Sequence, residues 1–204
     1  MERNRKKPGI WLMRGGMLLI VAALFLTGYN VKEEDQAGKE AARIISELPV
    51  EPKGPKADET PDYTLSPDLE MPFDSIEGNS YIGVLELPSL GLALPVLKEW
   101  SYPNLRIAPC RYTGSVYKEN MVIAGHNYST HFGHLKGLVP GDPILFMDVD
   151  GNVFHYKVVK VEILGPTEIE RMTEGDWPLT LFTCTLGGRS RVTVRCENVK
   201  GEEK

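Results

Sequence analysis

Short runs of hydrophobic residues, separated by Gly, Pro, Asn and Asp, follow one another from about residue 79 onward. The runs are rich in Val, Ile, Leu, Phe and Thr, which favour β-strands. Residues 155–163 (HYKVVKVEI) alternate polar and apolar side chains, as a half-buried strand does. Asp150 and Gly151 predict a hairpin turn that precedes this strand. We expect strands in residues 81–88, 92–97, 120–126, 142–148, 152–164, 179–185 and 191–199.

Helical signals are few in this part of the chain, and residues 133–139 (GHLKGLV) predict at most a short turn. Seven or eight strands within roughly 125 residues, without alternating helices, indicate an all-β fold. The pattern therefore predicts either a closed β-barrel or a β-sandwich.

The first thirty residues have a different pattern. Residues 15–29 carry no charge, basic residues precede them and the acidic stretch KEED follows. The apolar run becomes long enough to span a bilayer if it begins at Ile10 and Arg14 snorkels towards the headgroups. Because positive charge stays on the cytoplasmic side, we predict a cytoplasmic tail (1–9) and a membrane anchor (10–29), with the rest of the chain outside. The alternative is a cleaved signal peptide, although FLTGYN offers no convincing cleavage site.

A spacer is predicted between this anchor and the strands. Residues 31–49 could form a short helix with Ala41, Ile44, Ile45 and Leu48 on one side. Residues 49–72 are rich in proline and charge and cannot build a core. We interpret residues 30–78 as an extracytoplasmic tether and residues 79–204 as the functional domain. A lid over the functional site is the alternative role of the tether.

Composition narrows the class of protein. A chain of 204 residues with 42% hydrophobic and 25% charged residues fits one well-buried domain plus appendages. A net charge of -5 offers no basic face for nucleic acid, so we expect no nucleic-acid partner. Three cysteines are too few and too scattered for a disulfide framework.

Three residues at the edges of the predicted strands carry suitable chemistry for acyl transfer. Cys184 ends a strand, His126 follows another, and Arg191 opens the last one. A thiol becomes a strong nucleophile as its thiolate, which a nearby imidazole or guanidinium favours. The histidine can transfer a proton, and the guanidinium can stabilise an oxyanion.

Each of these residues also has a structural interpretation. Cys184 could be a core residue or could form a disulfide with Cys196 across a hairpin. His126 could be an ordinary polar loop residue. Arg191 could belong, with Arg189 and Arg195, to a solvated basic stripe on one face of a strand.

Metal binding is the remaining option. His126, His131 and His134 lie close in sequence, but their spacing matches no common zinc signature, and the chain has no CxxC. Cys110 has the character of a small apolar filler. We expect no metal and no cofactor.

Four segments resemble the sortases, the cysteine transpeptidases of the Gram-positive cell surface. TLFTC (180–184) is similar to their TLxTC signature, and IAGHN followed by FGHLKGLVPGD resembles the segment that carries their histidine. RVTV (191–194) resembles the strand that opens with the sortase arginine. The first strands of the sortase barrel resemble the segment YIGVLELPSLGLALPV. The resemblance covers most of residues 80–200 in the expected order, and the anchor and tether agree with it.

This resemblance implies a closed eight-stranded sortase-type β-barrel with short helices. Cys184 would attack the threonine carbonyl of a Leu-Pro-x-Thr-Gly-like sorting motif in a surface protein and form a thioacyl intermediate. His126 would act as general acid and then as base, Arg191 would stabilise the oxyanion, and Thr183 would contact the bound motif. The acceptor would be an amine of the cell wall, commonly that of a peptidoglycan precursor.

Three questions stay open at the level of sequence. Arg189 is an alternative to Arg191 as the catalytic arginine, because both follow the short TLGG turn. A membrane-anchored cysteine hydrolase would use the same groups with water as the acceptor. A non-catalytic surface-binding barrel would keep Cys184 buried or oxidised.

Overall fold

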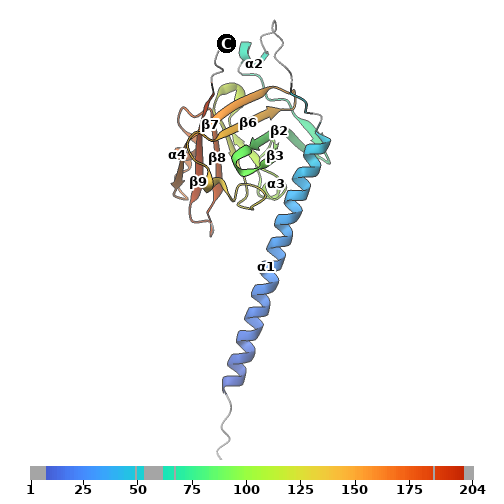
Figure 1. Ribbon diagram of the computed structural model, residues 1–204, viewed down its shortest axis with the longest axis vertical. Coiled ribbons are helices and arrows are strands. Elements are labelled where there is room, and N and C mark those ends of the chain that lie inside the picture. The colour runs from blue at the N-terminus through green and yellow to red at the C-terminus, as the bar shows by residue number, and fades with distance from the viewer. Residues whose placement is uncertain (1–7, 49, 53–61, 67, 186, 200–204) are drawn as a thin grey trace, which may run out of the picture. The chain divides into compact units, whose positions relative to one another are not determined.

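A computed structural model describes residues 8–48, 50–52, 62–66, 68–185 and 187–199 (Figure 1). The chain forms two compact units, Met1–Gln36 and Ala37–Lys204. Most of the expected cytoplasmic tail and a large part of the proline-rich tether lie outside the described residues.

The N-terminal helix α1 runs without interruption over Pro8–Glu47. It is long and apolar enough to cross a membrane, judged by its length and composition. From the sequence we expected a spanning segment and a separate short helix. Instead they form one helix, because the chain has no proline between Pro8 and Pro49 to interrupt the hydrogen-bond ladder.

The second unit is built on a β-barrel (Figure 1). Among the described residues nine strands pair in the order β1-β2-β3-β4-β5-β8-β9-β7-β6, and a further pairing of β2 with β6 closes the ring of eight strands. The short β1 pairs with the beginning of β2. The strands are β1 Asp74–Ile76, β2 Asn79–Leu87, β3 Leu92–Leu97, β4 Cys110–Thr113, β5 Met121–Ala124, β6 Pro143–Asp148, β7 Val153–Leu164, β8 Leu179–Cys184 and β9 Arg191–Asn198. The expected closed eight-stranded barrel is therefore confirmed.

Strand alternation divides the hydrophobic residues between the inside and the outside of the barrel. The main core includes Ile123, Leu181 and Val194, which come from the adjacent strands β5, β8 and β9. Their sequence neighbours point outwards, and Ala124 and Phe182 belong to a different apolar cluster. This outer cluster lies on the face of the sheet that also carries Cys184, because Phe182 and Cys184 are two residues apart on β8.

A further apolar cluster joins residues 37–48 to the barrel. Ile44 and Leu48 are buried against Tyr81, Val84 and residues of β3 and β4. The compact barrel unit thus begins at Ala37 and includes part of the segment that we interpreted as a tether. That packing follows from the apolar side that the sequence predicts for this helix.

Several short elements were not expected from the sequence, among them β1, β4, α3 (Tyr102–Leu105) and α4 (Ile169–Thr173). β4 has only four residues, two of which are polar side chains that leave no clear alternation. The two helices have four and five residues, too few for a 3.6-residue period to emerge. The predicted turn at residues 133–139 is present as the short 3-10 helix η3 (Leu135–Gly137).

Candidate active site

The candidate site lies at one edge of the barrel, where three neighbouring strands meet. β5 and β8 are parallel neighbours, with Ala124 opposite Phe182, so both strands end at the same edge. Gly125 extends the pairing by donating its N–H to the Phe182 carbonyl at 3.0 Å. His126 follows Gly125, and Cys184 lies two residues beyond Phe182. The topology therefore brings His126 and Cys184 to the same end of two adjacent strands, which are about 4.8 Å apart in a sheet.

Arg191 completes this row from the other side. β8 and β9 are antiparallel, and Cys184 is the direct cross-strand partner of Arg191. Cys184 is an exposed free thiol, and Arg191 is half-buried. Nη1 of Arg191 donates to the carbonyls of Gly188 (3.1 Å) and Ser190 (3.2 Å) in the β8–β9 loop. Arg189 is exposed within that loop and lies outside the β8–β9 ladder.

The imidazole of His126 is oriented by its own loop. It stacks on the Tyr128 ring with a centroid separation of 4.0 Å and an angle of 14°. Its Nδ1 lies 3.1 Å from Oδ1 of Asn127. If Nδ1 donates that hydrogen bond, the neutral ring keeps the lone pair for proton transfer on Nε2. Asn127 and Tyr128 were not singled out from the sequence, although their adjacency to His126 was the available signal.

Thr183 does not share the surface of its neighbour Cys184. Its side chain is 2% exposed and, by strand alternation, points away from the cysteine side of β8. Its Oγ1 is buried and has no hydrogen-bond partner among the described residues. The structure therefore does not place Thr183 beside the exposed thiol, and its contact with a bound motif stays a prediction.

A buried apolar cluster packs on the face of β8 that carries Cys184. Phe182 packs with Leu164 and Met172 in the outer cluster. Leu164 is opposite Arg191 on β9, which in turn is opposite Cys184, so the cluster reaches the row of polar site residues. The ring of Tyr112 meets Phe182 edge-on, with centroids 5.4 Å apart.

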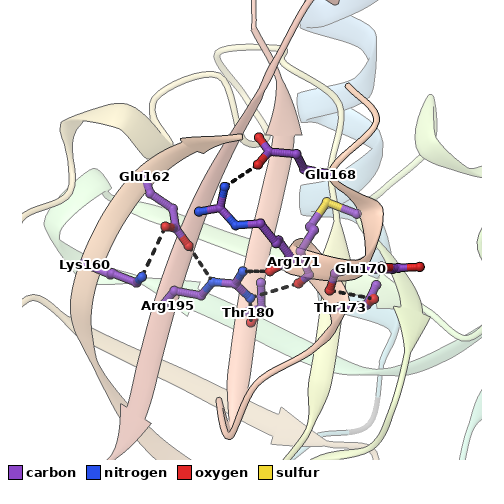
Figure 2. Close-up of polar contacts among 9 residues, drawn as sticks. Lys160, Glu162, Glu168, Glu170, Arg171, Thr173, Thr180 and Arg195 are labelled. Atoms are coloured by element: carbon purple, nitrogen blue, oxygen red, sulfur yellow. Dashed lines mark hydrogen bonds and ion pairs between the residues drawn. The ribbon is translucent and has the colours of Figure 1, made fainter. Parts of the chain in front are cut away.

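Arg195 lies on the same face of β9 as Arg191, yet its surroundings are different. Its side chain is buried and donates from Nε to Oε1 of Glu162 at 3.0 Å, as Figure 2 shows. The solvated basic stripe considered for Arg189, Arg191 and Arg195 is therefore wrong for Arg195. Burial raises the pKa of Glu162, but hydrogen bonds from Arg195 and Lys160 outweigh it and hold this pKa below its ordinary value.

The alternative disulfide between Cys184 and Cys196 is also wrong. Both thiols are free, and the partner of Cys196 on β8 is Leu179, at the other end of the ladder from Cys184. Roughly 16 Å of strand separates the two positions, whereas bridged cysteines need Cα atoms within about 7 Å. Cys196 belongs to the barrel core.

We expect the three cysteines to differ sharply towards alkylating reagents. Burial raises the pKa of the Cys110 and Cys196 thiols to about 12, so near neutral pH both are protonated as well as inaccessible. Iodoacetamide should therefore modify Cys184 alone in the folded protein, and peptide mapping by mass spectrometry measures this. Unfolding in guanidinium provides the control, in which all three react. Equal modification of Cys196 and Cys184 in the folded protein would contradict the arrangement.

Gly125, next to His126, is packed too closely to accept a side chain. A Cβ atom there would lie 2.3 Å from Cδ2 of the buried Phe132. Gly125→Ala should therefore destabilise the fold by about 1–3 kcal/mol, the usual cost of overpacking. Thermal unfolding followed by near-ultraviolet circular dichroism measures the loss. The matched control is Gly137→Ala, since no atom lies within 4 Å of a Cβ at that position; a comparable loss in both variants would contradict the explanation.

The histidines considered as metal ligands have unlike environments. His131 is fully buried, His134 is exposed and His126 is half-buried. Within the part of the chain that the structure describes, no group of three or more His, Cys, Asp or Glu residues could hold a metal ion.

Comparison with known proteins identifies one family. The model of the sortase domain matches residues 85–199. The chain is 34% identical over 125 residues to a sortase A of Bacillus anthracis, an alignment that covers 58% of this chain and 59% of that protein. The matched region thus spans less than two thirds of that relative.

Solved structures agree on the fold. A sortase D5 transpeptidase of Clostridium perfringens superposes with a TM-score of 0.56 at 17% identity, covering 79% of this chain and 97% of that one. A sortase A from Corynebacterium diphtheriae gives a TM-score of 0.54 at 20% identity, covering 84% and 86%. At such low identity these similarities establish the fold alone.

Proposed function

Because the chain belongs to the sortase family, we propose that it is a membrane-anchored cysteine transpeptidase of the cell surface. It cleaves a C-terminal Leu-Pro-x-Thr-Gly-like sorting motif in surface proteins and transfers the threonine acyl group to an amine. The observation that supports this most directly is the row formed by an exposed Cys184, its cross-strand partner Arg191, and His126 at the end of the adjacent strand.

The first half of the proposed reaction forms a thioester. The thiolate of Cys184 attacks the threonine carbonyl, and the electron pair moves to the oxygen. Arg191 stabilises this oxyanion with a charge that persists at working pH. Collapse of the adduct breaks the Thr–Gly bond, and protonated His126 gives its proton to the departing glycine amine.

The second half reverses these roles with a new nucleophile. Neutral His126 removes a proton from the incoming amine, which attacks the thioester and expels the Cys184 thiolate. The acceptor is an amine of the cell wall, commonly that of a peptidoglycan precursor. Water in place of the amine would give a hydrolase, and it is the competing acceptor at the same site.

The proposed location follows from the N-terminal helix. α1 is long and apolar enough to act as a membrane anchor. We propose a single span with the basic N-terminus inside, because basic residues precede the apolar run and acidic residues follow it. The barrel would then face the cell wall, where the sorting motifs and the acceptor amine are found.

A peptide assay tests the proposed function. The full chain in detergent micelles is incubated under reducing conditions with fluorogenic sorting-motif peptides, with and without an added amine. Cleavage between Thr and Gly that yields an amine-linked product supports the transpeptidase. The same cleavage without amine-linked product would replace it with the hydrolase, and no cleavage of any motif in the panel would contradict both.

A further inference from the structure

The segment between β7 and β8, residues 165–178, contacts the outer face of the barrel beside the candidate site. It leaves β7 directly after Leu164, which lies in the cross-strand row of Arg191 and Cys184. It contains α4, whose Met172 is buried against Phe182 and Leu164. Met172 therefore ties the segment to Phe182, which lies two residues before Cys184 on the same face of β8.

α4 cannot hold this position by its own stability. It has only five residues, whereas isolated helices below about 12 residues are marginal in water. Its N-cap residue, Glu168, makes no side-chain capping hydrogen bond. The last carbonyl groups of any helix also lack intrahelical partners. The segment needs an external donor to fix it.

Arg195 supplies that donor from β9, as Figure 2 shows. Its Nη1 donates to the Met172 carbonyl at 2.8 Å, and its Nη2 donates to the Arg171 carbonyl. Both carbonyls belong to the last turn of α4, where the helix dipole also favours a cation. The guanidinium therefore caps the C-terminal end of the helix.

The same guanidinium is held firmly on the sheet side. Nη1 also donates to Thr180 Oγ1 at 3.1 Å, and Nε donates to Glu162 Oε1 at 3.0 Å. Lys160 donates to the other oxygen of Glu162 at 3.1 Å. All three guanidinium nitrogens thus have acceptors, which offsets the cost of burying the charge. A lysine could not span these divergent acceptors with one ammonium group.

We propose that Arg195 is a positioning residue that fixes the 165–178 segment against the outer face of the barrel and thereby sets the affinity for the peptide bound at Cys184. This inference rests on the proposed function. Arg195 lies four residues along β9 from Arg191 and acts on the segment rather than on the reacting atoms. Its loss should therefore weaken peptide binding more than it slows the chemical steps.

The test compares Arg195→Met with wild type, both as full chains in detergent micelles. We expect KM for the sorting-motif peptide to rise at least about tenfold while kcat changes less than about threefold, since misplaced binding groups mainly lose substrate positioning. Hydrogen exchange should accelerate in residues 166–174 and stay unchanged in β5 and β8. Lys157→Met is the matched control, because it removes the exposed Lys157–Glu197 pair between the same two strands; it should change neither quantity.

The outcomes separate this inference from the proposed function. If wild type cleaves the peptide and Arg195→Met keeps both its KM and its protection in residues 166–174, the positioning role is overturned. If wild type cleaves no peptide, the proposed function fails, whereas exchange still tests whether Arg195 holds α4. If Arg195→Met does not fold, Arg195→Lys takes its place, with an intermediate KM expected. Wild-type KM and exchange in that lysine variant would overturn the inference.

Discussion

Cys184→Ala is expected to abolish both cleavage of the sorting-motif peptide and formation of the amine-linked product, with a loss in kcat of at least about 10³-fold. Cys184 is an exposed free thiol at the end of β8, paired across the ladder with Arg191. The proposed reaction has no other group that can carry the acyl chain, so removing the sulfur removes the intermediate itself. Initial rates with the fluorogenic peptide and mass spectrometry of the product measure the two losses.

Two further variants make this expectation specific to the nucleophile. Cys184→Ser keeps the size of the side chain but replaces the thiol with a hydroxyl, which forms its anion far less readily, so it should be nearly as inactive as the alanine variant. Cys110→Ala removes a buried thiol elsewhere in the barrel and should retain activity in whatever fraction folds. Residual activity of Cys184→Ala above about a tenth of wild type would rule out Cys184 as the nucleophile.

The strands of the barrel could be predicted because their side chains alternate between a packed interior and an outer face. This pattern is plain in residues 155–158 of β7, where exposed and buried side chains alternate, before a bulge between Val158 and Lys160 interrupts it. It is absent from β4, whose four residues CRYT are too short and too polar to reveal it. Closure through β2 and β6 joins strands that are far apart in sequence, so no local pattern carries it. The resemblance to sortases supplied that part of the expectation.

The residues of the candidate site could be selected by type and position, but their proximity could not be derived from spacing. His126 and Cys184 come to the same edge because β5 pairs directly with β8, although two other strands, β6 and β7, lie between them in the sequence. Arg191 was easier to place, since a short turn between antiparallel strands puts it opposite Cys184. Thr183 is next to Cys184 in the sequence but not on the same face of the sheet, because neighbouring residues of a strand face opposite sides.

Arg195 was the least predictable functional candidate. Alternation correctly places it on the same face as Arg191, but Arg195 is buried because its side chain donates hydrogen bonds to carbonyls of α4, whereas Arg191 is only half-buried. That segment contains a helix of five residues, which leaves no periodic signal. Whether a charged residue on a strand faces water or a buried acceptor depends on which segments pack over it. The alternation of residues along a strand does not carry that information.

Arg191→Ala is expected to lower kcat/KM for the peptide by about 10²–10³-fold, whereas Arg189→Ala should stay within about threefold of wild type. Arg191 is the cross-strand partner of Cys184, and Arg189 lies outside that ladder in the exposed loop. Both hydrogen bonds from the Arg191 guanidinium to described residues come from Nη1, which leaves Nε and Nη2 for a substrate oxygen. A guanidinium beside the thiol can therefore bind the oxyanion as it develops.

The comparison of these two variants also separates catalysis from loop structure. Since Arg191 binds the Gly188 and Ser190 carbonyls, its removal could act by loosening the β8–β9 loop. Arg191→Lys addresses this, because it keeps the charge but loses the planar fork, and it should recover only part of the rate. Thermal unfolding of all three variants shows whether the barrel is intact. If Arg189→Ala lowered kcat/KM more than Arg191→Ala, Arg189 would be the catalytic arginine. Cross-strand pairing between β8 and β9 would then not explain the position of the catalytic arginine.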